Sequence, residues 1–129
     1  MIINSFDRSN YKQKYTQEEI KIVEKYLKQL LKNNPNNMKL CINNYYIKVG
    51  YIEGEFIQYP ITANNLYDMI KQVDSIYETS CSNLKGYSCE SRVRLDLIKD
   101  GISSSIYCRT INFRGLSQRF IRNAKRNMK

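Results

Sequence analysis

The chain has 129 residues, a formal net charge of +9, 42% hydrophobic residues and 26% charged residues. This length and composition are typical of one globular domain and argue against an intrinsically disordered chain. Histidine is absent from the sequence, which excludes Ser-His-Asp and Cys-His nucleophiles as well as His-ligated metal sites.

The first predicted element is a helix that follows a polar, loosely ordered arm at residues 1–15. Thr16 and Glu19 form a T-x-x-E capping box, the pattern that satisfies the first free amides of a helix. Apolar residues then recur at helical spacing. Asn34-Pro35 ends the helix, because proline excludes the residue before it from the α region.

A β-type composition rich in Ile, Tyr, Val and Phe extends from residue 38 to residue 61. We expect two or three antiparallel strands here, at about 38–43, 45–52 and 55–60. The pattern leaves open whether Asn43-Asn44 is a turn or part of one long strand. A second helix from about Ala63 to Glu78, capped by Thr62 or Asn64, is expected next, followed by a polar loop.

The clearest strand signal is a hairpin from Tyr87 to Phe113 with Asp100-Gly101 at its turn. Asp-Gly between two runs of alternating apolar residues is a strong indicator of a type I′ turn. Ser117 is then expected to cap a last helix that runs to about Asn127.

These elements, in the order α-β-β(-β)-α-β-β-α, predict an α+β fold in which residues 16–129 form one domain. We expect an antiparallel sheet of four to five strands, in two hairpin or meander units, packed by three helices. No repeat or change of composition marks a linker between domains.

The hairpin register predicts a candidate binding surface. Counting outward from the turn gives two pairs on an apolar core face: Leu95 with Ile106, and Val93 with Cys108. The same count gives two pairs on the exposed face: Arg94 with Tyr107, and Arg92 with Arg109. Because guanidinium groups grip phosphates and aromatic rings stack on bases, this composition favours contact with nucleic acid. The alternative is a solvated face whose arginines are paired by nearby acids.

Positive charge is concentrated in the C-terminal part of the chain. Seven of the eight arginines follow residue 91, and no acidic residue follows Asp100. Arg119, Arg122 and Arg126 recur at helical spacing, which places them on one stripe of the last helix. We expect this stripe, together with Arg114, to contact a polyanion. The alternative is a cationic face that only complements the helix dipole and aids solubility.

The other motifs favour a protein without catalytic function. The sequence has no glycine-rich phosphate loop and no recognisable acidic metal-binding pattern, so we expect no cofactor and no metal. The four cysteines (Cys41, Cys81, Cys89 and Cys108) lack CxxC spacing and are expected to be free thiols, with a Cys81–Cys89 disulfide as the minor alternative. No apolar run reaches the length of a membrane span, and the first residues do not resemble a secretory signal.

We therefore expect a non-catalytic cytoplasmic protein that binds nucleic acid, or another nucleotide-containing or polyanionic ligand. The hairpin face and the basic last helix would make the contacts. The alternative is a small phage or mobile-element inhibitor or adaptor of the anti-defence type, which would bind the acidic surface of a host protein. A small enzyme without histidine chemistry is a third hypothesis. The sequence does not determine which ligand is bound, whether the protein prefers DNA or RNA, or whether the chain forms a homo-oligomer.

Overall fold

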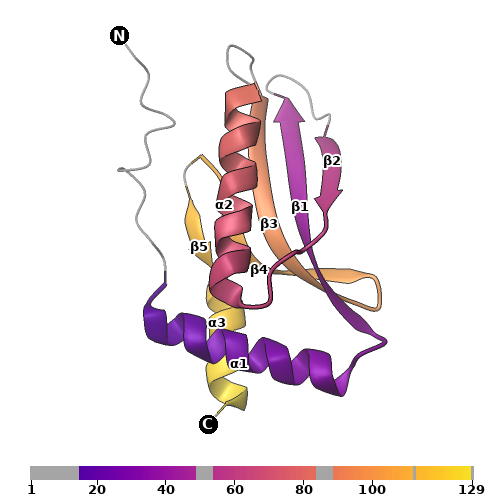
Figure 1. Cartoon of the computed structure of the whole chain (residues 1–129), viewed down its shortest axis with the longest axis vertical. Helices are drawn as coiled ribbons and strands as arrows, with labels where there is room; N and C mark the ends of the chain where they lie inside the picture. Colours follow the sequence, from indigo (N-terminus) through magenta and orange to yellow (C-terminus); the bar gives the residue numbers. More distant parts are fainter. Residues whose placement is uncertain (1–14, 49–53, 84–88, 112, 129) are drawn as a thin grey trace.

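The computed structural model describes residues 15–48, 54–83, 89–111 and 113–128, which form three helices and one five-stranded sheet (Figure 1). In chain order the elements are α1 (Gln17–Asn33), β1 (Met38–Lys48), β2 (Gly54–Tyr59), α2 (Leu66–Asn83), β3 (Cys89–Lys99), β4 (Ile102–Arg109), β5 (Arg114–Leu116) and α3 (Gln118–Asn127). Neighbouring strands are antiparallel, in the spatial order β2-β1-β3-β4-β5. The predicted α+β fold with an antiparallel sheet and three helices is confirmed.

Side-chain caps explain where α1 and α3 begin. The Thr16 hydroxyl accepts a hydrogen bond from the Glu19 amide (3.1 Å), and the Glu19 carboxylate accepts one from the Thr16 amide (2.9 Å). This is the predicted capping box. At the start of α3, the Ser117 hydroxyl accepts a hydrogen bond from the Phe120 amide (3.3 Å). Both predicted caps are confirmed.

The bounds predicted for α2 are wrong at both ends. The helix begins at Leu66, and Asn65 is the residue whose side chain accepts from the Asp68 amide (2.8 Å). It continues to Asn83, through residues predicted to form a polar loop. Ser80 explains part of the extension, because it is buried and its hydroxyl accepts a hydrogen bond from the Asn44 side chain of β1 (2.7 Å). The helix thus extends beyond its predicted end because Ser80 packs against the polar side chain of Asn44 in the sheet.

β1 is one long strand, so Asn43-Asn44 is not a turn. Asn43 pairs with Gln58 of β2 on one side and with Arg94 of β3 on the other. Both asparagines are almost completely buried, and side-chain hydrogen bonds compensate for their burial. The short strand β5, which was not predicted, forms the edge of the sheet beyond β4.

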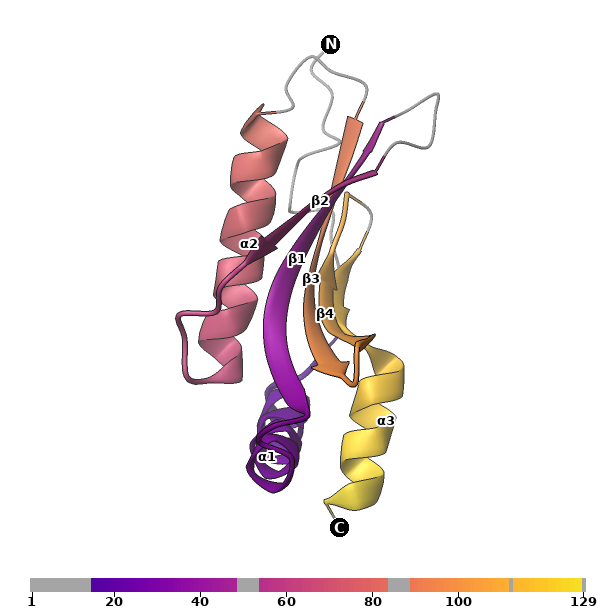
Figure 2. The same ribbon diagram turned by 90° about the vertical axis from the view of Figure 1, so that its right-hand side faces the viewer.

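The helices cover the sheet unevenly (Figure 2). α2 lies along one face, whereas α1 and α3 pack together below the end of the sheet where the β3–β4 hairpin turns. The core combines apolar residues from the helices and strands, with these side chains the most deeply buried: Val23, Ile42, Leu66, Ile70, Val73, Val93, Leu95, Ile106, Leu116 and Ile121. The elements therefore form a single small domain.

The predicted N-terminal arm lies outside the described residues, apart from Tyr15. The ring of Tyr15 packs edge-on against that of Tyr107, with 6.0 Å between the centroids. Among the parts of the chain that the structure describes, no helix has the length and apolar character needed to cross a membrane.

Candidate functional site

The predicted hairpin turn is confirmed, but the predicted register fails along the hairpin. Asp100 and Gly101 have φ angles of 51° and 81°, as a type I′ turn requires at both central positions. The pairs from Lys99–Ile102 to Asp96–Ser105 follow the predicted count. A β-bulge then shifts the register, so that Leu95 pairs with Tyr107.

The bulge places Tyr107 and Arg109 on the face of the sheet that α2 covers. One extra residue in a strand exchanges its two faces, so the predicted position of these side chains beside Arg92 and Arg94 is wrong. Ile106 is the extra residue, and its carbonyl accepts a hydrogen bond from the Ser117 amide (2.8 Å). The bulge therefore also ties β4 to the start of α3.

Asp74 of α2 is the centre of a cluster on the covered face. Its carboxylate accepts hydrogen bonds from the Tyr107 hydroxyl (2.7 Å) and the Arg114 guanidinium (2.7 Å). The Arg109 side chain is only 2% exposed, and its Nε lies 3.9 Å from the same carboxylate. The Arg109 guanidinium also lies 4.3 Å from the ring centroid of Tyr77. Tyr107 and Arg109 are thus engaged inside the fold, and Arg114 is partly engaged there.

The environment of Tyr107 favours a neutral hydroxyl. Burial, followed by the negative charge of Asp74 and the hydrogen bond to it, raises the pKa of Tyr107 above its ordinary value. The same hydroxyl accepts a hydrogen bond from Arg114 Nε (3.0 Å). The Tyr107 hydroxyl therefore stays protonated and connects the Asp74 carboxylate with the Arg114 guanidinium.

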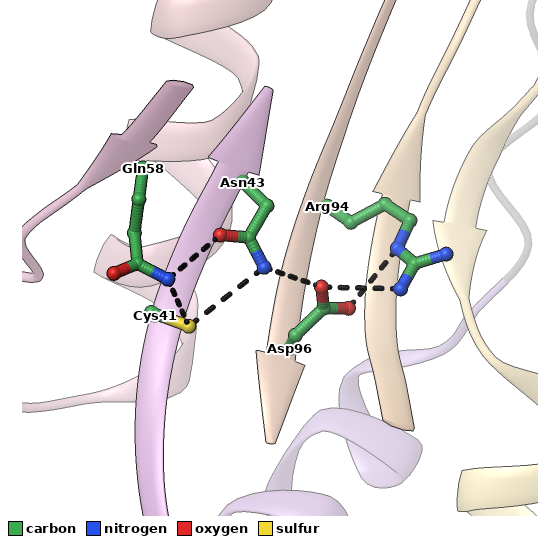
Figure 3. Close-up of polar contacts among 5 residues, drawn as sticks. All are labelled: Cys41, Asn43, Gln58, Arg94 and Asp96. Atoms are coloured by element: carbon green, nitrogen blue, oxygen red, sulfur yellow. Dashed lines mark hydrogen bonds and ion pairs between the residues drawn. The ribbon is translucent and has the colours of Figure 1, made fainter. Parts of the chain in front are cut away.

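The sheet face opposite α2 carries a polar network across three strands (Figure 3). We call it the open face, defined by Cys41, Asn43, Tyr45, Gln58, Arg92, Arg94, Asp96 and Cys108. Asp96 is fully buried and accepts hydrogen bonds from Asn43 Nδ2 (2.6 Å) and from Arg94 Nε and Nη2 (3.1 Å each). The Gln58 amide donates to Asn43 Oδ1 (3.1 Å). The side chains of β2, β1 and β3 are therefore held in one fixed arrangement.

The two arginines of the open face differ in their surroundings. The Arg94 guanidinium, held by Asp96, lies 5.2 Å from the ring centroid of Tyr45. Burial alone would lower the pKa of Arg94, but the hydrogen bond and charge of Asp96 outweigh it and the pKa is raised. Arg92 lies two positions earlier in β3 and is exposed. Within the described residues, no ion pair joins Arg92 to an acidic side chain.

The basic stripe of α3 lies where the sequence predicts it. Arg119, Arg122 and Arg126 are exposed, whereas the residues of the other face are buried: Phe120, Ile121 and Ala124. In the described parts of the chain, the ion pair from α3 to an acid is made by Lys125 to Glu19 (3.6 Å), and the three arginines make none. Their guanidinium groups are therefore accessible to a ligand.

Sequence reasoning missed the two carboxylates that organise the arginines. Asp74 follows Val73 in the apolar stripe of α2, and nothing in that pattern distinguishes it from a solvent-facing acid. Asp96 had a weak signal, because its alternation with Arg94 in β3 places both on one face. Its complete burial depends on Asn43 and Gln58, which come from strands far away in the sequence.

Cys41 and Cys108 are free thiols on the open face, and the side chains of Cys81 and Cys89 lie outside the described part. Burial raises the pKa of Cys108, although Arg92 and Arg94 partly oppose the shift. Burial also raises the pKa of Cys41, whose sulfur accepts hydrogen bonds from Asn43 and Gln58. Among the described residues, no cluster of three His, Cys, Asp or Glu side chains could hold a metal ion.

The raised pKa of Cys108 predicts slow alkylation in the folded protein. A higher pKa leaves less thiolate at a given pH, and the thiolate is the reactive form. At pH 8, iodoacetamide is expected to modify Cys108 more slowly in buffer than in urea, and the folded-state rate should go on rising with pH above the ordinary thiol pKa of about 8.5, where the rate in urea levels off. Timed quenching and peptide mass spectrometry measure both rates. Equal rates in the two conditions would contradict the assignment.

Comparison with protein-family models, with curated proteins and with solved structures finds no significant match for this chain. The accessible and engaged groups described above are therefore the basis for inferring a function.

Proposed function

We propose that this is a non-catalytic, nucleic-acid-binding protein that contacts phosphates through α3 and the open face of the sheet. The observation that carries the proposal is the stripe of Arg119, Arg122 and Arg126, three exposed guanidinium groups on a helix that contains no acidic residue. The opposite side of α3 is fixed in the core, so the stripe is presented on a rigid element. Guanidinium groups bind phosphate oxygens in a bidentate manner, which makes such a stripe suited to a phosphate backbone.

Arg92 and Tyr45 support extension of the contact surface to the sheet. Arg92 is exposed and Tyr45 is half-buried on the same face. An aromatic ring beside a cation is the combination with which single-stranded nucleic acids are commonly bound, by base stacking and phosphate contact. Tyr45 and Arg92 are cross-strand partners of β1 and β3. The Arg94 guanidinium also lies near the Tyr45 ring, but Asp96 already neutralises it. The free thiols Cys41 and Cys108 are consistent with our proposal of a cytoplasmic location.

Salt dependence tests this proposal. Each phosphate contact releases counterions, so the logarithm of the binding constant falls with the logarithm of salt by about 0.9 per duplex phosphate and about 0.7 for single strands. Replacing Arg119, Arg122 and Arg126 together with glutamine is expected to reduce the slope by roughly two to three units. Fluorescence anisotropy with labelled oligonucleotides over a range of salt concentrations measures the slope.

The control for the triple variant is Lys21→Gln with Lys28→Gln, which removes exposed charges from α1. This control should leave the slope within about one unit of the native value if contacts are confined to α3 and the sheet. Circular dichroism checks that each variant is folded. An unchanged slope in the folded triple variant would refute the role of the stripe.

A second candidate function is a phage or mobile-element inhibitor that binds an acidic host protein. The observation that favours it is Ile102, which is 71% exposed beside the hairpin turn. A protein partner would bury this side chain, and the positive charge of the surrounding surface would favour an acidic partner. Co-purification of a stoichiometric acidic protein, with no absorbance from nucleic acid, would favour this function over the first.

A further inference from the structure

A groove of about 640 Å³ lies between α1, α3 and the β3–β4 hairpin. Figure 2 shows these three elements around the lower end of the sheet. The volume falls within the range of about 300–1,000 Å³ that small-molecule sites occupy. The groove is distinct from the open face. Its lining includes Arg119 of the α3 stripe, but not Arg122 or Arg126.

The polar lining of the groove favours an anion. Lys99 of β3 and Arg119 of α3 contribute two positive charges, and the described residues that line the groove include no acid. Ser103, Ser104 and Ser105 line the groove on the β4 side, and Ser104, which pairs with Leu97, is the serine on the same face of the sheet as Leu97 and Lys99. Hydroxyl groups beside two cations can donate several hydrogen bonds to the oxygens of one phosphate.

The remaining lining is apolar and includes aromatic rings. Tyr26 and Leu30 come from α1, Leu97 from β3 and Phe120 from α3. The Tyr26 and Phe120 rings are in contact, with their centroids 5.6 Å apart and their planes at 54°. Phe120 is nearly buried, whereas Tyr26 is only half-buried. This side of the groove therefore offers an apolar surface against which a flat ring can pack.

We propose that the groove binds a single nucleotide carrying a terminal phosphate, either free or at the phosphorylated end of a strand. The phosphate would lie against Lys99, Arg119 and the Ser104 hydroxyl, and the base would pack toward Tyr26. The strand-end form rests on the proposed function, because α3 carries both the stripe and Arg119 of the groove. The two positive charges favour this occupant over an uncharged ligand.

The test is titration of the full-length, ¹⁵N-labelled protein with AMP, with adenosine as the ligand that lacks phosphate. Ser104→Trp fills the groove at an exposed position, and Lys99→Gln with Arg119→Gln removes its charge without adding bulk. Lys125→Gln is the matched control, an exposed cation of α3 that belongs neither to the groove lining nor to the arginine stripe. AMP is expected to shift the amide signals of Ser103 to Ser105 and of Arg119.

Both groove variants are expected to weaken AMP binding by about tenfold or more, as for loss of a charge-assisted contact to phosphate, and adenosine should bind weakly to every form. Lys125→Gln should stay within about twofold of the native affinity. Competition by a 5′-phosphorylated trinucleotide, but not by its unphosphorylated form, would assign the strand end as the source. AMP binding without such competition would assign the free nucleotide.

Absence of AMP binding, or AMP affinity unchanged in both groove variants, would overturn the groove assignment. The proposed function is tested separately by Arg122→Gln with Arg126→Gln, which lie outside the groove. A reduced salt slope in that variant without any AMP site would leave phosphate-backbone binding in place and remove only the nucleotide site. An intact AMP site with an unchanged slope would support the groove as a free-nucleotide site and refute the stripe.

Discussion

Replacement of Asp74 with alanine is expected to lower the free energy of unfolding by about 3–5 kcal/mol. The reason is Arg109, which is 2% exposed and has Asp74 as a close carboxylate partner. Removing the acid takes a carboxylate away from the buried Arg109 guanidinium, which keeps its contacts with the Thr110 carbonyl and the Tyr77 ring. It also removes the acceptor of the Tyr107 hydroxyl. Urea unfolding followed by circular dichroism measures the loss.

Two other variants separate the charge from the rest of the cluster. Tyr107→Phe removes one neutral hydroxyl and should cost only about 1 kcal/mol. Ser75→Ala changes the exposed neighbour of Asp74 on the same helix and should alter stability by less than about 0.5 kcal/mol. If Asp74→Ala costs no more than Tyr107→Phe, then Arg109 does not depend on this carboxylate.

Replacement of Arg94 with alanine is expected to cost about 3–5 kcal/mol in the free energy of unfolding, because Asp96 stays buried and, among the described residues, keeps the Asn43 amide as its side-chain donor. Arg92→Ala, two residues away on the same face, removes an exposed arginine and should change stability by less than about 0.5 kcal/mol. Two arginines that look equivalent in the sequence should therefore differ strongly when unfolding is measured in urea.

The double variant Arg94→Ala with Asp96→Asn isolates the buried charge. Without the charge on residue 96, loss of Arg94 should be much less costly, so the double variant should be more stable than Arg94→Ala alone. A double variant less stable than Arg94→Ala would show that packing of the Arg94 side chain, and not the charge of Asp96, dominates. The Arg94 side chain is 28% exposed, so replacing it should not open the hydrophobic core. The stability of both variants can therefore be measured.

These two carboxylates divide the arginines into two groups. Arg94, Arg109 and Arg114 are bound to Asp96 or Asp74, whereas Arg92 and the α3 stripe make no such pair among the described residues. A count of charged residues in the sequence treats all seven C-terminal arginines alike. The polyanion surface that we propose is consequently smaller than that count implies, and it is centred on α3.

The sequence by itself determined the elements whose signals are local. The capping box at Thr16, the Ser117 cap and the Asp100-Gly101 turn all depend on residues within a few positions of each other. The amphipathic stripe of α3 is local as well, since helical spacing alone separates Arg119, Arg122 and Arg126 from the buried face. Such features can be recognised in the sequence without knowing where the rest of the chain lies.

Only the tertiary structure decided which face of the hairpin Tyr107 and Arg109 occupy. The bulge at Ile106 reverses the alternation of β4, and the partners that accept the reversed side chains, Asp74 and Tyr77, come from α2. The tertiary structure also decided the position of Asn43. Asparagine is common in turns, but Asn43 is buried in β1 because Asp96 and Gln58 form hydrogen bonds with its side-chain amide. A local pattern cannot show where a polar or amphipathic side chain lies, because its burial becomes favourable only once a distant partner meets its hydrogen bonds.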